Sequence, residues 1–136
     1  MKTLKDIQIL IGSIGENIDL PKGMALFIQD KPLDDATPYL EIKSNEYHYV
    51  IRERGIEYSR NITSDLNELL YWFFENVVSE LSFEYEFNNR IKGEDSRRQA
   101  FTKKTALLNQ LDSSWKDRWL LEMEIILEKN PYNDNL

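Results

Sequence analysis

The chain of 136 residues contains no cysteine and a single histidine, His48. The absence of cysteine excludes disulfide bonds and thiolate metal sites, and one histidine leaves a zinc site or a catalytic relay without co-ligands. The sequence also lacks a P-loop, a G-x-G-x-x-G motif and a nucleophile elbow. His48 lies in an alternating segment and is expected to be a sheet residue rather than a ligand. We therefore expect no enzymatic activity, no metal and no cofactor.

Long apolar runs are also missing. The first residues, MKTLKDIQILIGSIG, begin basic and turn apolar, but Asp6 and Gln8 interrupt the run and no small-residue cleavage site follows. The segment is therefore read as an amphipathic helix, and no stretch is long enough to span a membrane. The chain has no internal repeat and no low-complexity linker, which predicts one domain over residues 1–136 with a loose tail after about residue 131.

The charge is unbalanced: 24 acidic residues against 17 lysines and arginines give a formal net charge of −7. A negative surface repels phosphate, so direct binding to nucleic acid is not expected. The same charge favours a basic protein as the partner and speeds the encounter with it. The alternative is that the negative charge only keeps the protein soluble.

The hydrophobic period predicts an α+β fold: helices packed on a small antiparallel meander of three strands, with residues 24–29 as a candidate fourth strand. Helical periodicity, caps and breakers predict four helices, the second of them long and central. The strands are expected at 39–43, 46–53 and 56–62, and the helices at 3–17, 65–92, 95–111 and from Ser113 or Ser114 to about 130.

The long helix contains four consecutive aromatics, Tyr71 to Phe74, within LLYWFFENVVSE. At about 100° per residue most of its apolar side chains form one broad arc, whereas Trp72 and Phe83 lie together on another flank. Tryptophan is enriched at binding hot spots, so this flank is a candidate interface. The alternative is that the last helix, with Trp115 and Trp119, folds over it as core.

Acidic residues accompany this flank. The candidate partner-binding set comprises Trp72, Phe83, Glu68, Glu75 and Glu86, with the loop acids Asp34 and Asp35 as a second choice. Glu84 lies in the middle of the apolar arc, where an unpaired carboxylate is costly. We therefore expect Glu84 to be buried and bonded to Arg97, Arg98 or a tyrosine.

Four segments together resemble the immunity protein 63 family: EYHYVIRERG (46–55), ELLYWFFE (68–75), SFEYEFNNRIKGEDSRRQAF (82–101) and EIILEKNPY (124–132). The resemblance implies a cytoplasmic antitoxin of a bacterial polymorphic toxin or contact-dependent growth inhibition system. We expect this protein to bind its cognate toxin C-terminal domain tightly and without covalent chemistry, and to be a monomer or weak homodimer when free. The net charge adds the hypothesis that the toxin is a basic nuclease. The competing class is an acidic adaptor module or homodimeric binding domain unrelated to toxins.

Overall fold

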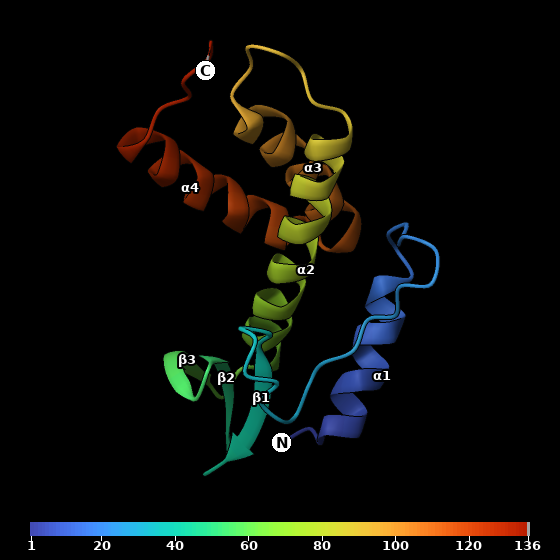
Figure 1. Cartoon of the computed structure of the whole chain (residues 1–136). Coiled ribbons are helices and arrows are strands. Elements are labelled where there is room, and N and C mark those ends of the chain that lie inside the picture. The colour runs from blue at the N-terminus through green and yellow to red at the C-terminus, as the bar shows by residue number, and fades with distance from the viewer. Residues whose placement is uncertain (136) are drawn as a thin grey trace. The chain divides into compact units, whose positions relative to one another are not determined.

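The computed structural model describes residues 1–135 and confirms the α+β prediction (Figure 1). The chain divides into two compact units, the first from Met1 to Phe73 and the second from Phe74 onward. The prediction of one domain remains a prediction, and each unit is described by itself. The elements are α1 (Leu4–Gly15), β1 (Tyr39–Lys43), β2 (Glu46–Glu53), β3 (Ile56–Thr63), α2 (Leu66–Asn88), α3 (Ser96–Leu111) and α4 (Ser113–Lys129).

The first unit begins with α1, and a capping box forms the N-terminus of this helix. The backbone N–H of Asp6 donates to Thr3 Oγ1 at 3.2 Å, and the Thr3 N–H donates to Asp6 Oδ2 at 3.3 Å. Ile7 and Ile11 are fully buried on one face of the helix. The amphipathic helix predicted from the sequence is therefore present, with its apolar face in the core.

The sheet has the order β1-β2-β3, with both neighbouring pairs antiparallel. Each hairpin turns through two residues with positive φ, Ser44-Asn45 and Arg54-Gly55. Two consecutive positive φ values are the requirement of the type I′ turn, whose twist matches that of the flanking strands. These turns fix the register, so Leu40 of β1 lies opposite Tyr49 of β2.

The candidate fourth strand at 24–29 is not formed; Gln29 makes only an isolated bridge to β1. Two backbone groups of this segment instead form hydrogen bonds with the side chain of Gln8. Gln8 Nε2 donates to the Leu26 carbonyl at 2.8 Å, and the Ile28 N–H donates to Gln8 Oε1 at 2.9 Å. The Gln8 side chain thus supplies two hydrogen bonds of the kind that a neighbouring strand would provide.

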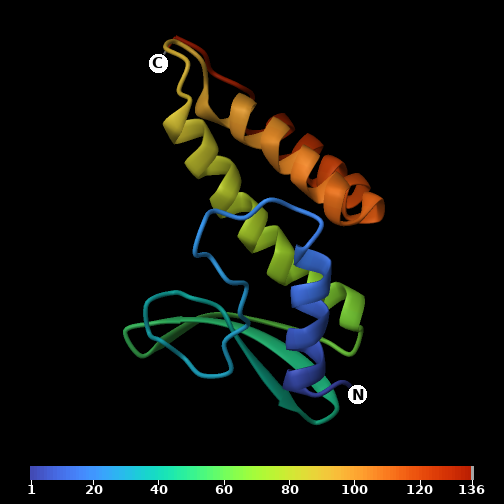
Figure 2. The same ribbon diagram turned by 90° about the vertical axis from the view of Figure 1, so that its right-hand side faces the viewer.

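The second unit consists of the later part of α2 together with α3 and α4, which pack on each other (Figure 2). Asp112 joins the last two helices: it ends α3, and its Oδ1 accepts from the Ser114 N–H at 2.8 Å to start α4. The cap is therefore Asp112 and not a serine. α2 ends at Asn88, four residues earlier than expected, and the Asn89 side chain donates back to the Tyr85 carbonyl at 2.9 Å.

The chain end returns to the connection between α2 and α3, as both ribbon views show. The Asn133 N–H donates to Asp95 Oδ2 at 2.9 Å, and Asp134 pairs with Arg98 at 3.0 Å. The guanidinium carbon of Arg98 also lies 4.2 Å from the centroid of the Tyr132 ring. Tyr132, Asn133 and Asp134 therefore contact residues at the start of α3.

Candidate partner-binding surfaces

Trp72 lies in the first unit and is half-buried. Its ring stacks on Tyr49 of β2, with centroids 6.4 Å apart and planes at 27°. Glu68, one turn earlier on α2, is also half-buried. Both side chains therefore keep an accessible part, while the tryptophan is anchored to the sheet.

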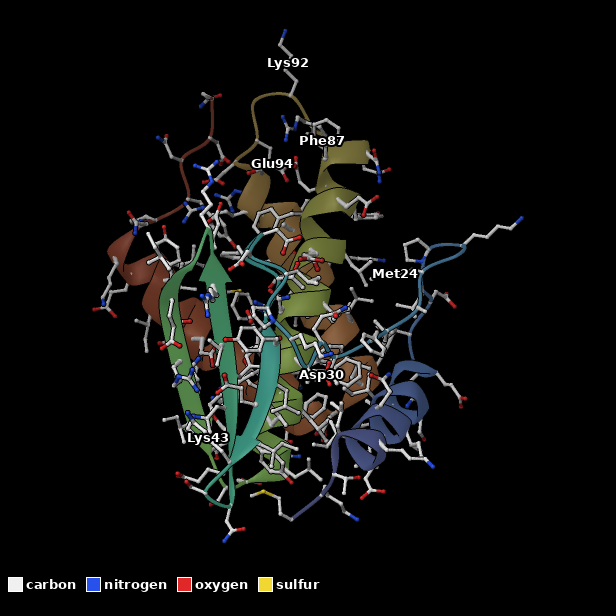
Figure 3. The ribbon with its side chains drawn as sticks, turned by 60° about the horizontal axis from the view of Figure 1, so that its bottom comes forward. Met24, Asp30, Lys43, Phe87, Lys92 and Glu94 are labelled. Atoms are coloured by element: carbon white, nitrogen blue, oxygen red, sulfur yellow. The ribbon has the colours of Figure 1, made fainter. Side chains whose placement is uncertain are left out.

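Phe83 lies in the second unit with 44% of its surface exposed. The edge of its ring meets Phe101 of α3, at a centroid distance of 6.5 Å and an angle of 82°. One turn later, Phe87 is 69% exposed and projects from the last turn of α2 (Figure 3). Phe87 was not among the binding residues predicted from the sequence, although its spacing of four residues from Phe83 places the two rings on the same helix face.

Glu75 was expected on the solvent side of α2, but it is half-buried and forms an internal ion pair. Its Oε1 lies 2.6 Å from Lys104 Nζ and also accepts from Ser79 Oγ at 3.2 Å. Lys104 itself is buried. Because the glutamate holds a buried cation inside the unit, its carboxylate is engaged before any partner arrives.

The burial of Glu84 and Glu86 is the reverse of the prediction. Glu84 is exposed, so the expectation that it is buried and bonded is wrong, whereas Glu86 is 3% exposed. The cause is the buried row of α2 in this unit, which advances by four residues through Phe74, Val78, Ser82 and Glu86. Ser82 and Glu86 are polar, so a pattern of apolar residues does not reveal that row.

Glu86 forms an ion pair with Arg90, which lies four residues later. Arg90 Nη2 lies 3.0 Å from Glu86 Oε1, and its Nε lies 3.2 Å from Oε2. This two-point contact raises the pKa of the Arg90 guanidinium, chiefly through hydrogen bonds to Glu86. Glu86 thus orients an arginine at the end of α2.

The loop acids Asp34 and Asp35 are exposed and tied to the β2–β3 turn. Asp34 Oδ1 accepts from the Gly55 N–H at 3.2 Å and lies 3.3 Å from Arg52 Nε. Asp35 Oδ1 accepts from the Thr37 N–H at 3.0 Å, and hydrogen bonds to Thr37 lower the pKa of Asp35. The loop therefore presents two exposed carboxylates whose positions are defined by hydrogen bonds to backbone N–H groups.

A polar cluster on the sheet was not predicted. Arg60 of β3 reaches Glu57 Oε1 at 2.7 Å and Glu41 Oε2 at 2.8 Å, and its Nη1 lies 3.1 Å from Nδ1 of the buried His48. The two carboxylates raise the pKa of Arg60, Glu57 more than Glu41. An arginine can only donate, so His48 Nδ1 is the acceptor of this hydrogen bond. The cluster pairs its charges internally and resembles a structural brace more than a reactive site.

The described part of the chain, residues 1–135, has no group of three or more acidic or histidine side chains placed to bind a metal ion. Within the same residues, no helix combines the length and the apolar character needed to cross a membrane. The candidate surfaces are thus the exposed loop acids and the accessible aromatic and acidic positions of α2.

A family model, described as immunity protein 63, matches residues 43–125. The match runs from the end of β1 into α4 and includes the whole of α2, so it covers more than half of the chain. No curated protein and no solved structure matches. The chain therefore belongs to the immunity protein 63 family.

Proposed function

We propose that this protein neutralises a cognate bacterial toxin domain by tight, stoichiometric, non-covalent binding, without cofactor or catalysis. The observation that carries the proposal is membership of the immunity protein 63 family. The partner is the C-terminal toxin domain of a polymorphic toxin or contact-dependent growth inhibition system. The immunity protein acts in the cytoplasm of the producing cell and its siblings, and is a monomer or weak homodimer when free.

The toxin domain is proposed to be a basic nuclease. The net charge of −7 favours a positive partner, and carboxylates can occupy the places of substrate phosphates in a nuclease cleft. Electrostatic steering also speeds the encounter, so a toxin is captured before it reaches nucleic acid. A toxin domain with an acidic surface would contradict this part of the proposal.

The proposed binding residues are those of the predicted set that remain accessible. They are Trp72 and Glu68 on α2, Phe83 further along α2, and the loop acids Asp34 and Asp35. Glu75 and Glu86, which hold Lys104 and Arg90, are assigned a supporting role. The loop acids lie before residue 43, where the family match begins.

The test uses the toxin-like C-terminal domain encoded next to the gene of this protein. That domain is expressed alone and together with this protein, and cell survival and co-purification are recorded. We expect toxicity alone, and rescue with a stable one-to-one complex on co-expression. Toxicity without rescue would reject the proposal in favour of an adaptor, and a concentration-dependent mass of the free protein would favour the homodimeric alternative.

A further inference from the structure

The outward face of α2 in the second unit carries two exposed phenylalanines that alternate along the sequence with two exposed glutamates. Phe83 and Phe87 are four residues apart, and so are Glu80 and Glu84. At about 100° per residue, all four fall within about 100° of the helix circumference. Their common face is opposite the buried row that ends at Glu86. We call Glu80, Phe83, Glu84 and Phe87 the phenylalanine stripe.

The two rings are held in place before any partner binds. Phe83 packs edge-on against Phe101 of α3. The guanidinium carbon of Arg90 lies 5.3 Å from the centroid of the Phe87 ring, and Arg90 is fixed by the buried Glu86. Aromatic side chains that are already ordered lose little conformational entropy on binding. The second unit thus displays ordered rings that it does not itself cover.

The glutamates of the stripe make the face negative. Glu80 and Glu84 are exposed, and neither forms an ion pair among residues 1–135, unlike Glu75 and Glu86 nearby. Unpaired carboxylates beside exposed aromatic rings are complementary to apolar surface bordered by lysine or arginine. A second copy of this acidic chain would place like charges against one another.

We infer that the phenylalanine stripe is a docking surface for a basic face of the toxin domain, with Phe83 and Phe87 entering an apolar depression and Glu80 and Glu84 pairing with flanking cations. The inference rests on the proposed function and deepens it by naming a surface. Phe87 is the hot spot, because it has the largest surface left to bury.

The test measures the affinity for the neighbouring toxin domain, inactivated in its active site, by titration calorimetry at low and high salt. Phe87→Ala is compared with Leu121→Ala, a 65% exposed apolar position on α4. The charge variant Glu80→Lys/Glu84→Lys is compared with Glu124→Lys/Glu128→Lys on α4. The two α4 glutamates are also exposed and four residues apart, so both double variants have the same net charge. Thermal unfolding checks that each variant is folded.

We expect Phe87→Ala to weaken binding about thirtyfold, mainly through faster dissociation, while Leu121→Ala changes it less than about threefold. The Glu80→Lys/Glu84→Lys variant should lose at least about tenfold at low salt and less at high salt, because screening removes the attraction. Its α4 counterpart should lose clearly less.

The docking surface would be overturned if both charge variants lost the same affinity, or if Phe87→Ala kept the wild-type affinity. In either case, binding of the toxin domain by the wild type would leave the proposed function intact. A homodimer that Phe87→Ala dissolves would also overturn the docking surface, because a second copy would then occupy the stripe. Failure of the wild type to bind or neutralise the toxin domain would reject the proposed function itself, and the docking surface with it.

Discussion

Lys104 Nζ lies 2.6 Å from Glu75 Oε1, and the same ammonium group lies 3.7 Å from the centroid of the Trp119 ring. Trp119 in turn donates its Nε1–H to Thr105 Oγ1 at 3.0 Å. A buried lysine of α3 is thereby held between a carboxylate of α2 and an aromatic face of α4. The contact connects all three helices of the second unit and is part of its core rather than its surface.

The two partners of this pair should differ in their effect on stability. Glu75→Gln leaves a buried ammonium group without its counter-charge and should cost about 3 kcal/mol of unfolding free energy. Lys104→Met leaves a carboxylate whose side chain is 35% exposed and still hydrated, so its cost should be nearer 1 kcal/mol. Urea denaturation measures both. The double variant Glu75→Gln/Lys104→Met should recover most of the unfolding free energy that Glu75→Gln loses. Lys103→Met serves as the control. Equal losses of unfolding free energy in the two single variants would contradict the expected asymmetry.

Ala36 adopts a positive φ of 70°, which an L-residue with a Cβ rarely does. Its N–H donates to the Arg52 carbonyl at 3.1 Å, which holds the loop in this conformation. Ala36→Gly should therefore stabilise the protein by about 0.5–1 kcal/mol, because relief of strain outweighs the extra freedom of the unfolded chain. Ala106→Gly, within α3, should instead destabilise by about 1 kcal/mol. Thermal and urea unfolding compare the two, and a loss of stability at both positions would show that Ala36 is unstrained.

The contacts of Asp95 and Arg98 with residues 133 and 134 should make the unfolding free energy fall at acidic pH. Hydrogen bonds from the Arg97 side chain, and then from the Asn133 and Arg97 N–H groups, hold the pKa of Asp95 well below its usual range. Arg98 likewise lowers the pKa of Asp134. Because these folded-state pKa values lie below the unfolded ones, the stabilisation is complete above about pH 5 and is lost as pH falls below about 4.

Asp95→Asn should lower the unfolding free energy at pH 7 and flatten its decline between pH 5 and 3. Asp117→Asn, on exposed α4 surface, is the control and should keep the wild-type profile. Urea unfolding at a series of pH values measures both. A decline as steep in Asp95→Asn as in the wild type would assign the acid sensitivity to other carboxylates.

Trp72→Ala should affect both folding and binding. The sequence alone predicts a large effect on toxin binding, about 2 kcal/mol, with little effect on folding. The stack on Tyr49 adds a folding cost of about 1 kcal/mol, which Trp72→Phe should largely avoid. Comparing unfolding free energy with toxin affinity for the two variants separates the contributions. Unchanged affinity in both would remove Trp72 from the proposed interface.

Local pattern predicts the elements of this fold well where the signal lies in neighbouring residues. The three strands follow from alternation and from turn residues such as Gly55, and α1 follows from isoleucines at helical spacing beside the Thr3 cap. The expected bounds of β1 and β2 match the observed ones. The misplaced ends have local causes as well: Asn89 terminates α2, and Asp112 precedes the serines that were expected to cap α4.

The sequence by itself determined the acidic charge, the absence of thiol chemistry, the α+β fold and the family. Tertiary structure decided which α2 carboxylates are exposed and without an ion-pair partner among residues 1–135. The buried row of α2 contains Ser82 and Glu86, and a partner such as Lys104 comes from another helix. Helical periodicity gives the angle between two side chains but not the direction in which the neighbouring helices lie. That direction buries Glu86 and leaves Phe87 and Glu84 exposed.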